Sequence, residues 1–181
     1  MILSGSQISA LAQKLYTSLN SSGKCEISIE PFNLAQVNPN SYNLRLSNKL
    51  LYTRASLDCR EKPEFVETTI PENGYLLLPN TLYLASTIEY TETRGLVPII
   101  DGRSSIGRLG LFIHVTAGYG DNGFCGHWTL ELACVVPLVI YAGMEICQIR
   151  YMLTDPNGER YNGKYQYTES PQPSRIWKEF E

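Results

Sequence analysis

The sequence predicts a mainly β protein with one domain over residues 1–181, built as an antiparallel sandwich or distorted barrel. A chain of 181 residues fits one domain with its own hydrophobic core. From about residue 25 onward it consists of short runs rich in Ile, Val, Leu, Tyr and Thr, which are typical of strands. Turn-forming groups such as NPNS, PENG and YGDNG separate these runs, and this spacing favours antiparallel connections over helical crossovers.

The first expected element is an amphipathic helix within residues 4–19. Serines at its start can cap the first turn. Apolar residues recur behind them at helical spacing, at Ile8, Leu11, Ala12, Leu15 and Leu19.

The predicted strands follow in order, each rich in β-branched or aromatic residues and bounded by turn signals. They are residues 25–30, 42–46, 49–54, 65–70, 74–78, 81–90, 95–100, 111–117, 127–133, 138–143 and 147–153. The segment 155–181 is polar, contains prolines and is rich in tyrosine, so we expect it to lie over a surface rather than complete the core.

The overall charge and the longest apolar run exclude two classes of partner. With a formal net charge of -3, the chain lacks the basic surface of a duplex nucleic-acid binder, so any phosphate site must be local. The run LACVVPLVIYAGM is interrupted by Pro137 and is shorter than the roughly 20 residues that cross a bilayer. We therefore expect neither a nucleic-acid partner nor a membrane.

The start of the chain and its cysteines indicate a cytoplasmic location. The N-terminus lacks the basic and apolar regions of a signal peptide. The five cysteines are scattered and include no C-x-x-C pair, which suits reduced thiols.

Two common kinds of catalytic centre find little support. His114 and His127 have no Cys or carboxylate neighbours at ligand spacing, and the motifs of zinc deaminases are absent, so we expect no zinc. Each histidine is more simply a core or surface residue. The G-x-S-x-G elbow of serine hydrolases is also absent.

The strand HWTLELA carries one candidate acid. Strict alternation places Thr129 and Glu131 on the same face of the strand. Because its neighbours are apolar, Glu131 lies either on a solvated face or in a cavity where the loss of hydration favours the protonated acid.

The stretch DGRSSIGRLG is the second candidate. Arg103 and Arg108 bracket Ser104 and Ser105 between glycines. Such a stretch is either an exposed turn or an anion site, because guanidinium groups and hydroxyls suit phosphate oxygens.

The close succession of these two stretches is similar to a known pattern. The chain resembles the dCTP deaminase family, relatives of trimeric dUTPases, from MILSGSQI through SYNLRL and DGRSSIGRLGLFIHVTAG to the terminal KYQ and PSRI. The resemblance implies a jelly-roll-like, dUTPase-like barrel with an N-terminal helix and short helices, assembled as a homotrimer.

The resemblance also implies a triphosphate clamp and a catalytic acid. The clamp would comprise Arg103, Ser104, Ser105, Ile106, Gly107 and Arg108. Ser104 and Arg108 would also reach the base and its water, and Mg²⁺ would be held mainly by the triphosphate. Glu131 would take a proton from the water that attacks C4 of cytosine, and would then protonate N3 and the leaving ammonia.

Other positions match nucleotide contacts of that family. The backbone at Ala117 would hold the attacking water, Asp121 would bind near the sugar, and Thr129 and Leu130 would contact the nucleotide beside Glu131. In the tail, Tyr161 and Lys164 match phosphate-binding positions that the resemblance assigns to a neighbouring subunit's site, and Thr168 stands at a further substrate-binding position.

The chain departs from the family pattern at several of these places. Gly120 and Asn122 stand where an aliphatic residue and a proline are usual, so we expect a looser loop around Asp121. Thr168 and Ser170 stand where a glutamine and a glycine are usual, which puts one phosphate contact and the closure of the tail in question.

The product is the main alternative that the sequence leaves open. The main interpretation is a dCTP deaminase that yields dUTP and ammonia. The sequence Ala117-Gly118-Tyr119 and the glutamine Gln148 resemble a bifunctional branch that yields dUMP and diphosphate. A dUTPase and a non-catalytic nucleotide-binding or jelly-roll interaction protein are the further alternatives, and regulation by dTTP is open.

Overall fold

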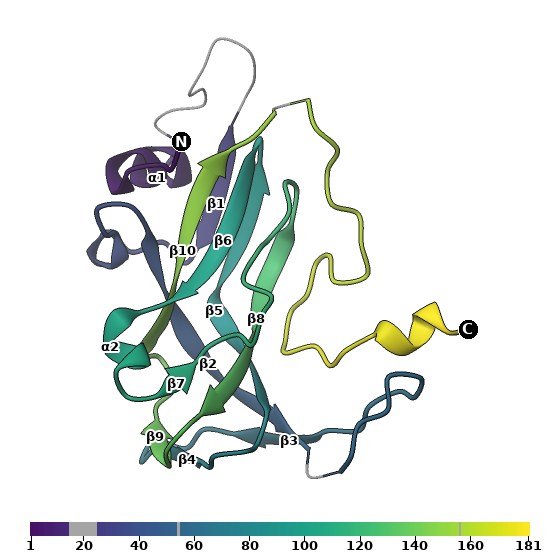
Figure 1. The fold of residues 1–181 in the computed structure, drawn as a ribbon. Helices are drawn as coiled ribbons and strands as arrows, with labels where there is room; N and C mark the ends of the chain where they lie inside the picture. Colours follow the sequence, from purple (N-terminus) through teal and green to yellow (C-terminus); the bar gives the residue numbers. More distant parts are fainter. Residues whose placement is uncertain (15–24, 54, 156) are drawn as a thin grey trace.

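The computed structural model describes residues 1–14, 25–53, 55–155 and 157–181 (Figure 1). Its helical elements are α1 (Gly5–Ala12), η1 (Leu34–Gln36), α2 (Ser104–Gly107) and η2 (Ile176–Glu179). Its strands are β1 (Glu26–Glu30), β2 (Tyr42–Tyr52), β3 (Val66–Thr69), β4 (Tyr75–Leu77), β5 (Tyr83–Arg94), β6 (Leu96–Gly102), β7 (Leu111–Phe112), β8 (Cys125–Cys134), β9 (Leu138–Ile140) and β10 (Glu145–Leu153).

The described strands form one large antiparallel sheet and one small one. The large sheet has the order β6-β10-β2-β5-β8-β7, with β1 paired to β5 and β3 paired to β2, and β4 pairs with β9. A bridge between Ile99 and Tyr119 joins β6 to the segment after β7, so the sheet curls into a nearly closed barrel. The predicted mainly β, antiparallel, barrel-like fold is confirmed.

The barrel interior is filled by alternate residues of the long strands, as a period of two requires. In β8, Leu130 and Leu132 are fully buried, and β10 contributes Ile149 and Tyr151. The indole of Trp128 donates a 2.9 Å hydrogen bond to the Thr91 hydroxyl, which satisfies a buried polar pair between β8 and β5. This packing leaves the opposite face of β8 free for chemistry.

The N-terminal helix is shorter than the sequence pattern predicts. Ser4 and Gln7 form a capping box at its start. The helix ends at Ala12, and Lys14 follows with φ 58°, a left-handed conformation that cannot continue a helix. The predicted residues Leu15 and Leu19 lie outside the described part of the chain.

Two strand predictions need correction. In place of separate strands at 42–46 and 49–54, the structure has one strand, β2 (Tyr42–Tyr52), whose pairing with β5 shifts register between Leu46 and Leu50. The strand predicted at 111–117 pairs only over Leu111–Phe112, because the chain then leaves the sheet as a loop.

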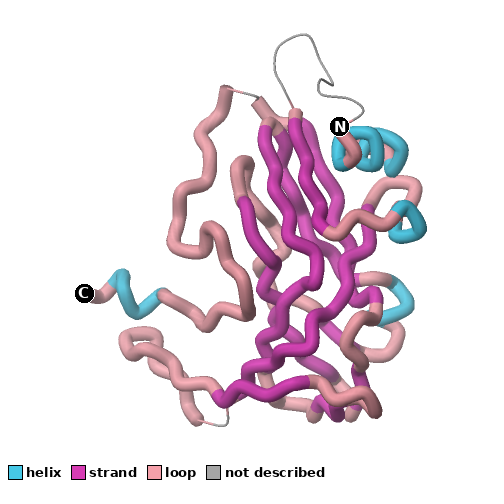
Figure 2. Tube along the Cα trace, turned by 180° about the vertical axis from the view of Figure 1, so that it is seen from behind, coloured by secondary structure: helices cyan, strands magenta, loops and turns pink. Residues whose placement is uncertain are grey.

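The C-terminal segment lies along the outside of the barrel beside β8. The His127 amide donates to the carbonyl of Thr168, and the Tyr167 amide donates to the carbonyl of Cys125. Seen from behind, the strands lie between the helices α1 and α2 on one side and this segment on the other (Figure 2). The C-terminal segment therefore lies over a surface of the barrel, as predicted.

No helix in the described part of the chain is long and apolar enough to cross a membrane.

Candidate active site

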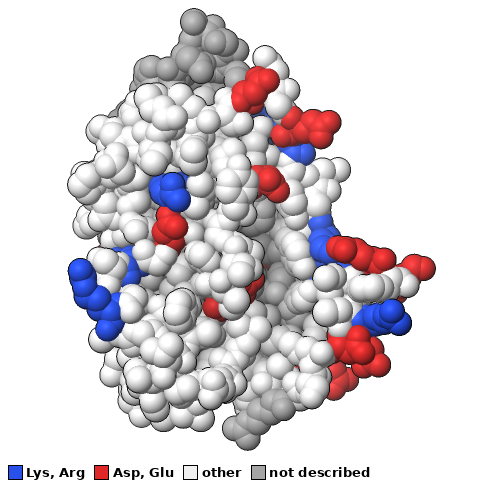
Figure 3. All heavy atoms as spheres, in the orientation of Figure 1, with Lys and Arg blue, Asp and Glu red and all other residues white. Residues whose placement is uncertain are grey.

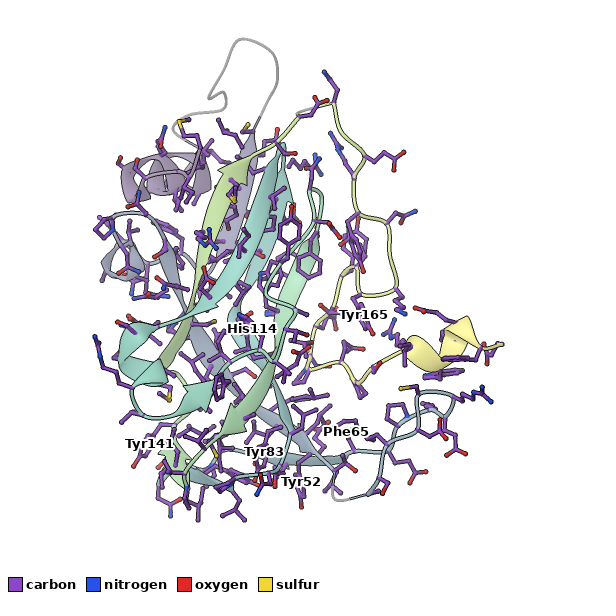
Figure 4. All side chains as sticks on the ribbon, viewed as in Figure 1. Tyr52, Phe65, Tyr83, His114, Tyr141 and Tyr165 are labelled. Carbon is purple, nitrogen blue, oxygen red and sulfur yellow. The ribbon has the colours of Figure 1, made fainter. Side chains whose placement is uncertain are left out.

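A cavity of about 670 Å³ lies between β8 and the C-terminal segment. The space-filling view shows this hollow between the body of the barrel and the segment that carries η2 (Figure 3). Phe65, from the loop before β3, and Tyr165, from the tail, approach it from two sides (Figure 4). The cavity has the size and mixed lining of a small-molecule site.

Strand β8 carries the candidate acid into this cavity. Its alternation buries Trp128, Leu130 and Leu132 and turns Thr129 and Glu131 outward, where both line the hollow. Of the two alternatives for Glu131, a solvated face or a cavity, the structure shows a cavity whose walls include Leu84 and Val115.

The Glu131 side chain is held by the loop that follows β7. Its Oε2 accepts a 3.0 Å hydrogen bond from the Val115 amide, and its own amide donates to the Ile113 carbonyl at 3.0 Å. One carboxylate oxygen is thereby fixed. The other, Oε1, has no hydrogen bond to the described residues that would fix it.

The same loop brings Ala117 to the cavity wall. It is fastened to β6 because the Ile100 amide donates to the Gly118 carbonyl at 2.7 Å and the Gly120 amide donates to the Pro98 carbonyl at 2.9 Å. A Cβ on Gly118 would lie 2.4 Å from the Ile100 carbonyl oxygen. This close approach explains why residue 118 is a glycine, which has no Cβ.

Asp121 also lines the cavity, and the loop around it is tied down rather than loose. Asn122 is buried, its side-chain oxygen accepts from the Gly95 amide at 2.8 Å, and its carbonyl accepts from the Tyr161 amide at 2.7 Å. The expectation of a looser loop is therefore corrected, because the Asn122 side chain supplies a contact that a proline could not.

Of the three predicted tail residues, two lie at the cavity and one does not. Tyr161 and Thr168 line the cavity of their own chain, and the Thr168 hydroxyl donates to the His127 carbonyl at 2.8 Å. Lys164 lies outside the cavity lining and pairs with Glu179. Its hydrogen bond and ion pair with that carboxylate raise the pKa of Lys164.

The predicted clamp lies elsewhere on the barrel. Ser104 and Ser105 begin the short helix α2, where they and Arg108 are exposed. None of the six predicted clamp residues is among the described residues that line the Glu131 cavity. In the single chain, α2 and the tail lie on opposite sides of β8 (Figure 1).

The remaining predicted residues divide between these two regions and the core. Gln148 belongs to the clamp side, where its side-chain nitrogen donates to the Gly102 carbonyl at 3.0 Å. Ile106 and Leu130 have buried side chains, so only their backbones are open to a ligand, and Gly107 is exposed. Among the described residues, no three His, Cys, Asp or Glu side chains converge as metal ligands.

The family of this chain follows from its sequence. A family model described as dCTP deaminase-like matches residues 2–154. The chain belongs to the dCTP deaminase-like family. The match covers β1 to β10 and so includes both the clamp and Glu131.

Similar members of this family carry a more specific name. Proteins called "dCTP deaminase, dUMP-forming" from Clostridium acetobutylicum and Hathewaya histolytica are 53% and 51% identical to this chain. The first alignment covers 99% of each protein, and the second covers 100% of each. A third such protein, from Cytophaga hutchinsonii, is 54% identical over 86% of this chain and 91% of its own length.

A solved structure supports the fold. The crystal structure of 2'-deoxycytidine 5'-triphosphate deaminase from Agrobacterium tumefaciens aligns with a TM-score of 0.65 and 22% identity. The alignment covers 84% of this chain, which spans about half (48%) of that longer chain. At this identity the likeness concerns the fold alone.

Several residues of the cavity are absent from the sequence-based prediction for this family member. Leu57 and Phe65 come from the loop before β3, and Tyr165 and Gln172 come from the tail. The Gln172 amide donates to the Thr129 hydroxyl at 3.1 Å, which fastens the tail to β8. No local pattern marks these residues, because long-range packing alone brings their segments to β8.

Proposed function

We propose that this chain is a dCTP deaminase that carries its substrate through to dUMP, releasing ammonia and diphosphate. The observation that carries the proposal is the 53% and 51% identity, over essentially the whole chain, to two relatives named as dUMP-forming dCTP deaminases. The position of Glu131 in a cavity of nucleotide size supports it from the side of the chemistry.

Glu131 is the proposed general base and acid of the deamination. Its fixed Oε2 sets the orientation of the carboxylate, and Oε1 is left for water. Glu131 takes one proton from the water as its oxygen attacks C4 of cytosine, and passes this proton to N3. It then takes the second proton from the new C4 hydroxyl and passes it to the amine, which departs as ammonia and leaves a carbonyl at C4. The Ala117 backbone and Asp121, on the same cavity wall, would hold the water and the sugar, with Thr129 beside the nucleotide.

The product dUTP would then lose diphosphate. Hydrolysis of the bond between the α- and β-phosphates adds a second water and leaves dUMP. Gln148, whose counterpart the resemblance assigns to the bifunctional branch, lies beside the clamp rather than beside Glu131. We therefore propose that Gln148 contacts the phosphate chain of the nucleotide.

A second copy of the chain would complete the site. The resemblance requires Ser104 and Arg108 to reach the same nucleotide as Glu131, yet neither of them lines the Glu131 cavity of its own chain. Large apolar side chains are exposed around α2, β7 and the end of β8, at Leu109, Phe112, Val115, Val135 and Val136. An exposed apolar patch of this kind marks an interaction surface, which supports the predicted homotrimer.

Mg²⁺ would accompany the nucleotide. This ion is commonly held by substrate phosphates together with few protein carboxylates, so its charge would offset the triphosphate that the clamp binds. The tail, with Tyr161, Lys164 and Thr168, would close over the bound nucleotide in its own or a neighbouring copy. The cytoplasmic location stays a prediction.

Incubation with Mg²⁺ and either dCTP or dUTP tests the proposal, with the products separated by chromatography. We expect dUMP from both nucleotides. Accumulation of dUTP from dCTP would reduce the function to a deaminase, dUMP from dUTP alone would indicate a dUTPase, and binding without turnover would leave a nucleotide-binding protein.

A further inference from the structure

The first clamp arginine is held by an acid that none of the assignments above includes. One guanidinium nitrogen of Arg103 donates to the Glu145 carbonyl at 2.7 Å, and the other lies 3.1 Å from Glu145 Oε2. Arg103 is a long side chain at the start of a four-residue helix, with no side-chain cap of its own. These two contacts turn it back toward β10 instead of into solvent.

A bulge in β10 makes this contact possible. Strict alternation would send Glu145 and Gln148, three residues apart, to opposite faces of the strand. The register of β10 against β2 shifts between Glu145 and Cys147, so Ile146 and Cys147 are both buried and Glu145 emerges on the same face as Gln148. Bulges that redirect a side chain are frequent beside active sites.

Glu145 is itself fixed by a buried residue of β2. The side-chain amide of Asn43 donates to Glu145 Oε2 at 2.7 Å, and Asn43 is buried. Asn43 is held in turn, because its side-chain oxygen accepts from Asn38 and its carbonyl accepts from Gln36, each at 2.7 Å. Arg103 is thus connected through Glu145 to the interior of the barrel wall.

We propose that Glu145, supported by Asn43, is a positioning residue that pre-orients Arg103 for the triphosphate. This rests on the proposed function, in which Arg103 contacts phosphate. Arg103 carries five N–H donors, and the contacts to Glu145 use two of its nitrogens without consuming all of the donors. A guanidinium held in place before binding loses less conformational freedom when the anion arrives.

Two opposing effects decide what the loss of Glu145 would do. Its negative charge repels a triphosphate, so removal of the charge alone would tighten binding. Its hold on Arg103 favours binding, so removal of the contact weakens it. The side chains of the pair are 30% and 33% exposed, and repulsion across such a solvated surface is screened. We therefore expect the loss of orientation to prevail.

Glu145→Gln removes the charge but keeps a side-chain oxygen that can accept from Arg103 and Asn43, so it reports the charge alone and should not raise KM. The test of positioning is Glu145→Ala, which removes the carboxylate that holds Arg103 and keeps the backbone carbonyl contact. We expect the KM for dCTP to rise about tenfold, the size of one charged hydrogen bond, with kcat within about twofold of the wild type. Binding of magnesium tripolyphosphate, measured by calorimetry, should weaken by a similar factor. The melting temperature should fall by only a few degrees, because the partly exposed ion pair contributes little to stability and only the Asn43 amide loses a buried partner.

Two comparisons separate positioning from other effects. Glu26→Ala removes another partly exposed acid, paired with Arg94 at 3.6 Å on strands β1 and β5, and should leave KM unchanged. In an Arg103→Lys background, Glu145→Ala should have no further effect on KM, since it acts through Arg103.

An unchanged or lower KM in Glu145→Ala, or an effect that persists in full in the Arg103→Lys background, would overturn the inference. If the wild-type protein leaves dCTP unchanged, the proposed function is wrong. In that case, the binding of magnesium tripolyphosphate to the wild type and to the Glu145→Ala variant still tests whether Glu145 positions Arg103, because this measurement needs no turnover.

Discussion

Glu131 shows how much the alternation of one strand can predict about a single residue. The pattern HWTLELA places Thr129 and Glu131 on one face, and the structure has both on the cavity side of β8. The pattern could not predict the Val115 amide as the partner of the carboxylate, because that contact depends on how the next loop folds. In the same way, nothing in the order of residues indicated that Glu145 would hold Arg103.

At this scale we predict that Glu131→Gln abolishes deamination while the fold persists. The amide is nearly isosteric and can still accept from Val115, but it cannot shuttle protons, so kcat should fall by about 10²–10⁴-fold. Ammonia release from dCTP measures the effect. Glu67→Gln, an exposed acid of β3 paired with Lys49, is the matched control. Turnover at the wild-type rate would remove Glu131 from the chemistry.

The loop between β7 and β8 is the element that the sequence pattern described least well. Its apolar and β-branched residues predict a strand over 111–117, yet pairing stops after Phe112. The reason is that its amides and carbonyls find partners outside the sheet ladder, in the Glu131 carboxylate and in Ile100 and Pro98 of β6. Strands with local alternation, such as β8 and β5, were predicted within a few residues of their bounds.

For this loop we expect Gly118→Ala to disturb its attachment to β6. The added Cβ would lie 2.4 Å from the Ile100 carbonyl oxygen and 2.6 Å from His114 Nε2, so the loop must shift. Overpacking of this kind costs about 1–3 kcal/mol of the free energy of unfolding, and denaturant titration measures it. The shift should also lower kcat through Glu131. Gly102→Ala, where the nearest atom is 3.6 Å away, should retain wild-type stability. Equal stability of both variants would contradict this account.

At the scale of the whole molecule, the barrel separates the two halves of the proposed site. The strand order places two strands, β2 and β5, between β10, which lies beside the clamp, and β8, which carries Glu131. Sequence proximity suggested one continuous site, since Arg108 and Glu131 lie within a short stretch of the chain. The curvature of the sheet, which no local pattern encodes, turns that stretch around the barrel.

Because the clamp and Glu131 lie apart in one chain, we predict complementation between two inactive variants. Arg108→Ala and Glu131→Gln should each be inactive alone. Co-expressed at equal levels, they should recover about a quarter of the wild-type deamination rate, because random assembly gives that share of sites with one intact half from each copy. Separate purified variants mixed without exchange of subunits serve as the control. A co-expressed sample no more active than the two variants alone would mean that each site is built from one chain.

The central claim is that this family member converts dCTP to dUMP, and the ratio of its two inorganic products tests it most directly. Ammonia and diphosphate are measured together while dCTP is consumed in the presence of Mg²⁺. The account predicts one diphosphate for each ammonia throughout the time course, with no build-up of dUTP. Ammonia released without diphosphate, or diphosphate released without ammonia, would contradict it.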